Sequence, residues 1–394
     1  MNAAEAIPGW LSAAGSVQYL SFVLRSLTER EAIRDNARAL SRRHVSSPNR
    51  RGMSFNPTQR KGLHVHYSVS VGCQPENALR NRYYQLEPYD RSRVVVVAGQ
   101  GSERRYVNAS WILERAGHKW WIATQAPLPS TAHAFLSLIA QPSARLATGF
   151  EIQIDPQAQS PFLSRVRTVV QLTQNFEGGR RKAHAYFPSD IGKSLVITPE
   201  EGCTTPAFQV TLLESRSFPE AHCIQSTVSV VPVDAASEGT SKPDDGENDS
   251  RQVVFRHMLY TSWPDHGVPS REDQASIIAF AQLVDAVNRD TQSGDANDSD
   301  PPVIVGCSAG VGRTGSFIAL SSLLRSLGRL PDASFPMSIS SLPPSPLGPL
   351  PTRLADDLVA QEVDFLREQR PRMVERDEQV LFIYEALASA LGAT

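Results

Sequence analysis

Residues 302–315 of this 394-residue chain read PVIVGCSAGVGRTG. The β-branched run from Val303 to Val305 is typical of a buried strand, and a glycine-rich loop follows it. The apolar residues that then recur at helical spacing are Phe317, Leu320, Leu324 and Leu327. This stretch therefore predicts a strand, a loop and a helix in immediate succession.

The loop between that strand and helix has the composition of an anion-binding site. Successive backbone N–H groups in such a loop point toward one centre, and a helix N-terminus adds roughly half a positive charge. Cys307 stands at the start of this positive field, which favours the reactive thiolate, and Arg313 can hold two phosphoryl oxygens at once. A nucleotide-binding loop would need Lys where Arg313 stands. A lone cysteine is more often a small buried hydrophobe, but in this loop we interpret Cys307 as a nucleophile.

The composition of the whole chain indicates a globular α/β protein. Short β-rich runs such as Thr168–Val170 alternate with helical stretches. The formal net charge of −2 gives no support for nucleic-acid binding, and four cysteines are too few for a disulfide scaffold. Pro8, Gly9 and Gly15 interrupt the uncharged stretch 6–24, so we expect no membrane span and no signal peptide. We expect a soluble protein of a reducing compartment, the cytoplasm or the nucleus.

The chain divides into a short tail and one domain. We expect an N-terminal tail at residues 1–16 and one domain at residues 17–392, the extent over which the chain resembles a known family in the order and spacing of its motifs. Composition shifts toward Pro, Ser, Gly or acidic residues indicate inserted loops near 141–165, 234–251 and 331–353.

Two segments have a biased composition that allows more than one interpretation. Residues 1–61 hold ten basic side chains against four acidic ones, and a helix is predicted from Val17 to about Arg43. We interpret the basic excess as a solvated helix face, the alternative being docking to an acidic partner or a membrane surface. The insertion 331–353 holds seven prolines, and we interpret it as a mobile linker or surface loop. The alternatives are a polyproline ligand and a kinase site at Ser345-Pro346.

Residues 305–315 resemble the signature loop of the protein tyrosine phosphatases, and six further motifs resemble others of that family in order along the chain. These motifs are Asn81–Tyr83 with Pro88–Val94 (the recognition loop), Tyr106–Ser110, Thr124–Pro129, Glu177–Lys182 with Tyr186–Pro188 (the E-loop), Trp263–Pro269 (the acid loop) and Arg367–Gln379 (the glutamine loop).

The resemblance implies a fold and an activity. The fold is a single α/β domain, a twisted mixed β-sheet flanked by helices, with the phosphate loop (residues 307–313) between a strand and a helix. The activity is that of a non-receptor protein tyrosine phosphatase, which acts in signal transduction on phosphotyrosine-containing proteins and needs neither cofactor nor metal. Cys307 would attack phosphorus, Arg313 would bind the phosphate, and Asp265 would protonate the leaving tyrosyl oxygen.

The resemblance also implies supporting roles. Thr314 would steady the departing thiolate, Gln379 would orient the attacking water, and Tyr83 would flank the substrate ring in a deep pocket. The remaining phosphate-binding residues would be Ser308, Ala309, Gly310, Val311 and Gly312. The residues that would support the loops are Trp263, Glu177, Lys182 and Glu375, with Glu177 pairing to Arg313 and Lys182 approaching Asp265.

Three positions depart from the family pattern. Gly306 replaces the histidine that normally precedes the nucleophile, so we expect Cys307 to be ionised less fully at neutral pH than beside a histidine. Glu375-Arg376 replaces a Gln-Thr pair, and Glu375 could either hold the water or repel the phosphoenzyme. Gln85 replaces an acidic residue that usually clamps the substrate backbone, so peptide anchoring could be weaker.

These departures leave a rival interpretation open. A pseudophosphatase would bind phosphotyrosine as a scaffold without turning it over. The intact Cys307, Arg313, Asp265 and Gln379 favour an active enzyme. A broader phosphatase of lipids or phosphoserine would need a shallower pocket than the Tyr83 loop predicts.

Overall fold

The computed structural model describes residues 7–46, 57–98, 103–141, 165–233, 252–265, 267–290 and 299–392. The insertion predicted at 234–251, and all but the end residues of the one at 141–165, lie outside the described residues. In the predicted tail, a five-residue helix α1 (Gly9–Ala13) buries Leu11.

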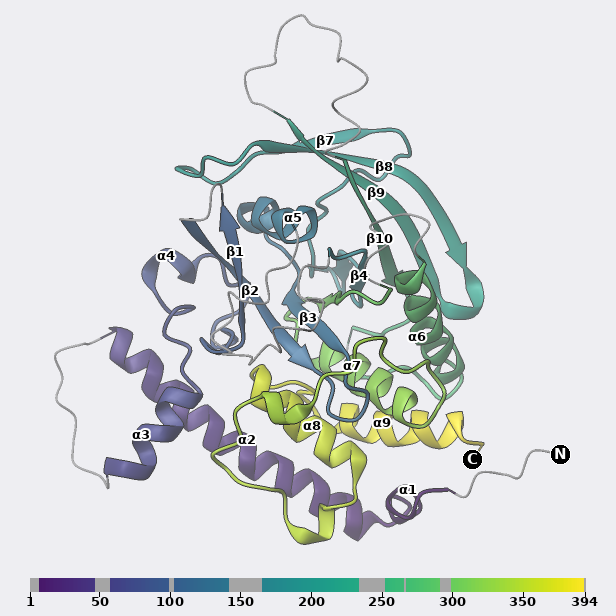
Figure 1. Ribbon diagram of the computed structural model, residues 1–394. Coiled ribbons are helices and arrows are strands. Elements are labelled where there is room, and N and C mark those ends of the chain that lie inside the picture. The colour runs from purple at the N-terminus through teal and green to yellow at the C-terminus, as the bar shows by residue number, and fades with distance from the viewer. Residues whose placement is uncertain are drawn as a thin grey trace, which may run out of the picture.

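A nine-stranded mixed sheet runs through the middle of the molecule (Figure 1). Its strand order is β1-β2-β3-β11-β4-β10-β9-β8-β7. The neighbours β3, β11, β4 and β10 are parallel, and the outer pairs are antiparallel. The strands are β1 (Arg93–Ala98), β2 (Glu103–Leu113), β3 (Trp120–Gln125), β4 (Thr168–Gln171), β7 (Ser194–Ile197), β8 (Ala207–Phe218), β9 (Cys223–Val233), β10 (Val253–Tyr260) and β11 (Val303–Cys307). A separate hairpin pairs β5 (Phe176–Glu177) with β6 (Arg180–Arg181).

Helices cover both faces of this sheet (Figure 1). The short helix α5 packs on one face, and α6 to α9 with part of α2 pack on the other. The longer helices are α2 (Val17–Ser46), α3 (Pro57–His66), α5 (Ala132–Ala140), α6 (Gln274–Arg289), α7 (Gly312–Ser326), α8 (Leu358–Gln369) and α9 (Asp377–Ala390), and α4 (Pro75–Ala78) is a single turn. The α/β fold predicted from the sequence is confirmed, as is the helix that starts at Val17.

The central strand β11 shows why the sheet is apolar on both sides. Val303 and Val305 belong to the core under α7, whereas Ile304 belongs to the core under α5. Side chains alternate between the faces of a strand, so a parallel strand covered on both faces needs a continuous apolar run. The strand ends at Cys307, which therefore lies at the carboxyl end of a central strand, five residues before α7 begins at Gly312.

The basic stripe on α2 does not form a solvated face, contrary to the interpretation of the charge pattern. Arg34 and Arg38 are fully buried. Arg34 forms ion pairs with Asp364 and Glu368, at 2.7 and 2.6 Å. Spacing of four residues places Arg30, Arg34, Arg38 and Arg42 on one side of the helix. That side faces the body of the protein because acidic partners lie there, which leaves these four arginines unavailable for docking.

The proline-rich insertion is a surface loop, one of the two forms predicted from the sequence, and it is packed against the protein rather than being a mobile linker. Arg30 donates hydrogen bonds to the carbonyls of Leu347, Gly348 and Pro349. Leu342 and Leu350 of the same segment are buried. The insertion therefore forms an ordered loop held against α2, and its prolines lower the entropy cost of that docking.

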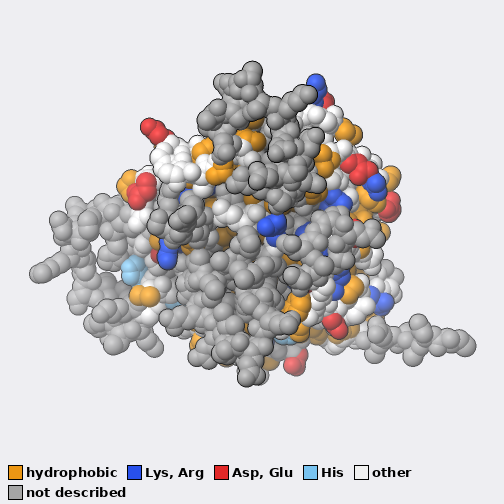
Figure 2. All heavy atoms as spheres, turned by 45° about the horizontal axis from the view of Figure 1, so that its top comes forward, with side chains coloured by type: hydrophobic (Ala, Val, Ile, Leu, Met, Phe, Trp, Pro, Cys, Tyr) orange, Lys and Arg blue, Asp and Glu red, His pale blue; other side chains and the backbone are white. Residues whose placement is uncertain are grey.

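The described surface is mixed in character. On the face shown in Figure 2, acidic side chains lie mostly at the rim and several basic side chains lie nearer the centre. None of the described helices is both long enough and apolar enough to cross a bilayer.

A buried pair of carboxyl groups joins β2 to α7 and α8. Glu362 accepts hydrogen bonds from the backbone N–H groups of Arg115 and Ala116 and from the Ser322 hydroxyl, at 2.8 to 3.1 Å. Burial and, less strongly, the neighbouring carboxylate of Glu114 together raise the pKa of Glu362 to about 7. The protonated form of Glu362 is therefore favoured in the folded state over a wide range of pH.

This raised pKa predicts a pH-dependent stability. The folded pKa of Glu362 lies above its ordinary value of 4.5, so the stabilising contribution of this group is complete below about pH 4.5 and is lost as pH rises through about 7. Relative to Glu362→Gln, the wild-type free energy of unfolding should fall by about 3 kcal/mol across that range. Urea unfolding at several pH values measures the difference. Glu29→Gln, at an exposed position of α2, is the control, and a pH-independent difference for Glu362→Gln would contradict the prediction.

Candidate functional site

The phosphate loop begins where β11 ends and closes where α7 starts. Cys307 is buried, and the N–H of Gly310 donates to its Sγ at 3.3 Å. Gly310 adopts a φ of +73°, which a side chain would strain. The thiol therefore faces a backbone N–H donor beside the start of a helix, an arrangement that favours a thiolate.

Arg313 is held in one orientation by three segments. Its two terminal nitrogens donate to the two carboxylate oxygens of Glu177, at 2.8 and 2.9 Å. The same nitrogens donate to the carbonyls of Leu172 and Pro264, at 3.0 and 2.7 Å. The expected Glu177–Arg313 pair is present, and it is a forked ion pair of the kind that fixes a guanidinium plane.

The acid loop is closed onto this arginine. Asp265 lies 2.5 Å from the Lys182 ammonium and 3.9 Å from Arg313. Trp263 is buried against Phe382 and donates from its indole N–H to the carbonyl of Gly267 at 3.4 Å. The structure thus brings together the E-loop, the acid loop and the phosphate loop, as the sequence motifs predicted for Lys182 and Asp265.

Gly178 permits this closure. Gly178 and Gly179 form the two-residue turn between β5 and β6, with φ of +54° and +72°. A Cβ on Gly178 would lie 2.6 Å from Oδ2 of Asp265, whereas one on Gly179 would meet nothing within 4 Å. A side chain at residue 178 would therefore press on the Asp265 carboxylate and move it from its observed position.

Tyr83 and Ser308 lie together at the mouth of the site. The Ser308 hydroxyl donates to the carbonyl of Lys182 at 2.7 Å, so the Tyr83 hydroxyl donates to Ser308 Oγ, also at 2.7 Å. The ring of Tyr83 is 39% exposed and stands beside the loop as a wall. Arg82 anchors the recognition loop by donating to the carbonyls of Ala126 and Pro127.

Of the remaining predicted residues, four lie in or against the phosphate loop and one, Glu375, lies at the surface. Gln379 is buried, and its side-chain amide packs against Gly312 of the phosphate loop. A Cβ added to Gly312 would lie 2.8 Å from Nε2 of Gln379. Thr314 is fully buried, and its hydroxyl has no hydrogen-bond partner among the described residues. Glu375 instead lies at the surface, 4.0 Å from Arg372. Ala309 is half-buried at the rim of the loop, and Val311 is buried below it.

Gly306, which stands where the family motif has histidine, is tightly packed. A Cβ at this position would lie 2.8 Å from the backbone carbonyl of Thr124 on the neighbouring strand β3. A small cavity of about 20 Å³ lies beside it, lined in part by Cys307, Phe135 and Tyr186. A histidine could not be restored here without moving β3 away from β11.

Arg370 is a site residue that the sequence motifs did not single out. It is fully buried and donates to the carbonyl oxygens of Ala309 and Gly310, at 3.3 and 2.7 Å. It is anchored by the side chains of Asn108 and Ser110, at 2.8 and 3.1 Å. The carbonyl of Ala309 and the N–H of Gly310 belong to one peptide unit, so Arg370 orients the N–H that points at Cys307.

The charge of Arg370 also bears on the nucleophile. Burial lowers its pKa to about 10, while the Tyr106 phenol and the Cys307 thiol act in the opposite direction. Its hydrogen-bond acceptors among the described residues are all neutral groups, so the Cys307 thiolate is an anion that this buried cation can stabilise. In the sequence, Arg370 is one of several arginines around the end of α8, and no spacing rule distinguishes it.

The described residues hold no group of three or more His, Cys, Asp or Glu side chains placed to bind a metal ion.

Comparison with known proteins gives matches over most of the chain. The family described as protein-tyrosine phosphatase matches residues 77–147 and 162–342. Human tyrosine-protein phosphatase non-receptor type 14 is 28% identical over 327 residues, which are 82% of this chain and 22% of that protein.

Two further relatives carry names of other kinds, one receptor-type and one for a lipid phosphatase. The Aedes aegypti putative receptor-type tyrosine-protein phosphatase mosPTP-1 is 26% identical over 342 residues, which are 86% of this chain and 20% of that protein. Human phosphatidylinositol phosphatase PTPRQ is 31% identical over 252 residues, which are 63% of this chain and 8% of that protein. The chain thus spans about a fifth or less of each of these relatives.

The placement of Arg370 predicts an effect on the reactivity of Cys307. In Arg370→Met, alkylation of Cys307 by iodoacetamide at neutral pH should slow by about tenfold, because an oriented N–H donor and a buried positive charge are lost. Arg370→Lys keeps the charge and should slow the reaction less. Arg372→Met, near the surface two residues on, is the control. A folded Arg370→Met protein that is alkylated at the wild-type rate would contradict the assignment.

Proposed function

The chain belongs to the protein-tyrosine phosphatase family, and on that premise we propose that it hydrolyses phosphotyrosine in proteins through a cysteinyl-phosphate intermediate. The observation that carries the proposal is the closed acid loop, with Asp265 3.9 Å from the guanidinium of Arg313. Nucleophile, phosphate-binding arginine and general acid then face one small volume at the end of β11.

In the first step the Cys307 thiolate attacks phosphorus. A sulfur–phosphorus bond forms, the bond from phosphorus to the tyrosyl oxygen breaks, and Asp265 gives its proton to that oxygen. Because the transition state is loose, positioning and charge stabilisation matter most. The fork of Glu177 holds Arg313 ready before the phosphate arrives, so little rotamer freedom remains to be lost.

In the second step water displaces the thiolate from phosphorus. Gln379, buried over Gly312, is placed to orient that water, and Asp265 accepts its proton. The buried Thr314 hydroxyl, which has no acceptor among the described residues, can donate to the departing Cys307 sulfur. The sulfur–phosphorus bond breaks and phosphate leaves.

The wall at Tyr83 supports selectivity for phosphotyrosine. Its hydroxyl is tied to Ser308, so the ring is fixed beside the phosphate loop and deepens the entrance. A phosphotyrosyl group is long enough to reach a buried Cys307, whereas a phosphoseryl group is not.

The rival proposal, a phosphotyrosine-binding pseudophosphatase, draws on Gly306 and Glu375. The surface position of Glu375, paired with Arg372, supports the active enzyme because a charge placed there does not face the phosphoenzyme. Arg370 supports it too. Gly306, packed against Thr124, stands where the family motif has histidine, and the buried cation of Arg370 is a positive charge on which the nucleophile can depend instead. Action on signalling proteins in the cytoplasm or nucleus remains part of the proposal.

Phosphate release from a phosphotyrosyl peptide by the purified chain tests the proposal. We expect turnover of that peptide, and none from a phosphoseryl peptide or from a phosphatidylinositol phosphate in mixed micelles. Cys307→Ser is the blank. Binding of the phosphotyrosyl peptide without turnover would replace this proposal with the scaffold function, and preferred turnover of the lipid would replace it with a lipid phosphatase.

The contact between Gly178 and Asp265 predicts a variant defective in acid catalysis. Gly178→Ala should lower kcat for a phosphotyrosyl peptide by about tenfold or more, because the added Cβ displaces Asp265. Hydrolysis of an aryl phosphate whose leaving group needs no proton should fall much less. Gly179→Ala shares the positive φ but has open space, so it is the matched control. Equal losses in the two variants, or on the two substrates, would count against the assigned role of Asp265.

A further inference from the structure

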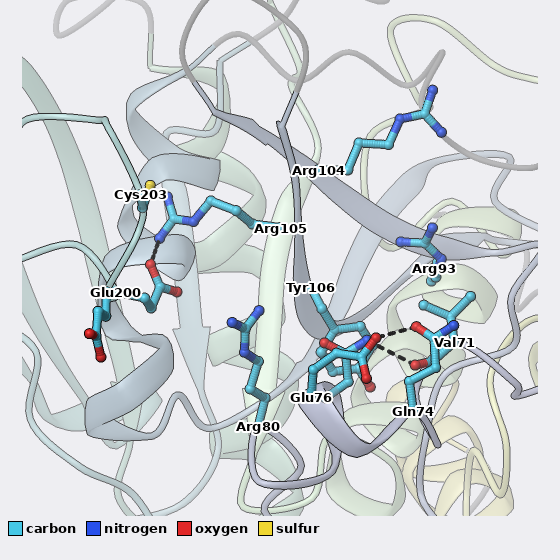
Figure 3. A pocket seen from close by; sticks show the side chains of 12 residues that line it. Val71, Gln74, Glu76, Arg80, Arg93, Arg104, Arg105, Tyr106, Glu200 and Cys203 are labelled. Atoms are coloured by element: carbon cyan, nitrogen blue, oxygen red, sulfur yellow. Dashed lines mark hydrogen bonds and ion pairs between the residues drawn. The ribbon is translucent and has the colours of Figure 1, made fainter. Parts of the chain in front are cut away.

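A second pocket lies behind the recognition loop. Its volume is about 420 Å³, and it is lined by α4, the strands β1 and β2, and the segment before β8. We call it the arginine pocket, after the arginines in its lining, which are Arg80, Arg93, Arg104 and Arg105. Figure 3 shows Arg93 and Arg104 on one side of it and Arg105 with Glu200 on the opposite side.

One of the four guanidinium groups is already neutralised. Arg105 is buried and forms an ion pair with Glu200, with further contacts to Ser137 and His133. Its charge is satisfied within the protein, so it forms a wall of the arginine pocket and not a binding group.

The other three arginines have no such partner. Within the described part of the chain, Arg80, Arg93 and Arg104 form no ion pair or side-chain hydrogen bond. The remaining acids in the lining, Glu76 and Glu201, are exposed and can turn toward solvent.

Arg93 is the group with the most to gain from an anion. Burial lowers its pKa, the Asp90 carboxylate and the Tyr106 phenol act in the opposite direction, and the neighbouring guanidinium of Arg104 adds to the lowering. The hydrogen bonds of Asp90 go to other groups, the Ser68 hydroxyl and the N–H groups of Ser70 and Val71. Arg93 is thus a half-buried cation beside the like charge of the exposed Arg104, and a doubly charged oxyanion between them would offset the cost of that arrangement.

The arginine pocket is joined to the substrate-recognition loop. The hydroxyl of Tyr106, in the wall of the pocket, donates to Asn81 at 2.6 Å, and Arg80 precedes Asn81 in the chain. Tyr83 stands two residues further on, beside Ser308. A polypeptide whose phosphotyrosine binds beside Tyr83 is therefore in contact with the same short loop that lines the arginine pocket through Arg80.

We propose that the arginine pocket binds a second phosphate group of the polypeptide substrate, carried by a residue that flanks the phosphotyrosine; this inference rests on the proposed function. Guanidinium forks suit phosphate because two donors match two oxygens, and arginine clusters are a recurring device for phosphorylated peptides. Arg93 and Arg104 are the binding groups, and Arg80 adds positive charge at the entrance.

Binding of phosphopeptides to the Cys307→Ser protein, measured by fluorescence anisotropy, tests the inference without requiring turnover. The peptides carry phosphotyrosine alone, phosphotyrosine with phosphoserine at increasing distances on either side, or phosphotyrosine with glutamate at those positions. One spacing of the doubly phosphorylated peptide should bind about fivefold tighter than the single one, as expected for one charge-assisted hydrogen bond near the surface. Glutamate should give a smaller gain.

Substitutions locate the gain. Arg104→Gln should abolish it while leaving affinity for the singly phosphorylated peptide unchanged. Arg216→Gln, at an exposed arginine of β8 that pairs only with Glu214 among the described residues, should retain it. The inference is overturned if no spacing gives a gain, if Arg104→Gln keeps the gain, or if glutamate matches phosphoserine. Failure of every form to bind the single phosphotyrosyl peptide would instead overturn the proposed function.

Discussion

The forked ion pair between Arg313 and Glu177 is the contact on which the geometry of the site depends. It fixes the plane of one guanidinium, whose other bonds run to Leu172 at the end of β4 and to Pro264 in the acid loop. Two segments far apart in the chain, residues 172–177 and the acid loop, are thereby set at defined positions beside the phosphate loop. Removal of Glu177 would leave a largely buried cation without its main partner, which is more costly than the pair itself is stabilising.

A second set of hydrogen bonds, centred on Arg370, supports the phosphate loop. Arg370 holds both peptide units that flank Gly310, and Asn108 connects Arg370 to Asn81 of the recognition loop. The residues that would recognise substrate and those that orient the nucleophile are therefore parts of one buried hydrogen-bond network. Such a network is rigid when every member is satisfied, which is what positioning at a reacting phosphorus requires.

Sequence patterns predicted the local elements of this molecule well and its charge pattern poorly. The strand, loop and helix around Cys307 follow from a short apolar run, glycines and helical spacing, all of which act over a few residues. Arg30 and Arg34 read as part of a solvated face because their partners Asp364 and Glu368 lie more than 300 residues away in the chain. The possibility that the proline-rich insertion is a mobile linker was wrong for the same reason, since the arginine that holds it lies on α2.

The division between local and tertiary information is clearest at the site itself. Cys307 and Arg313 lie within one loop, so backbone preferences over seven residues suffice to place them around an anion, and the motif around Asp265 predicts that it is the acid. Only the folded chain reveals that a side chain at Gly178 would press on Asp265, that Gly306 is closed off by Thr124, and that Arg370 supports Gly310. Each of these is a contact of a few ångströms between segments distant in sequence, and such distances are set by how the sheet and helices pack rather than by the preferences of either segment alone.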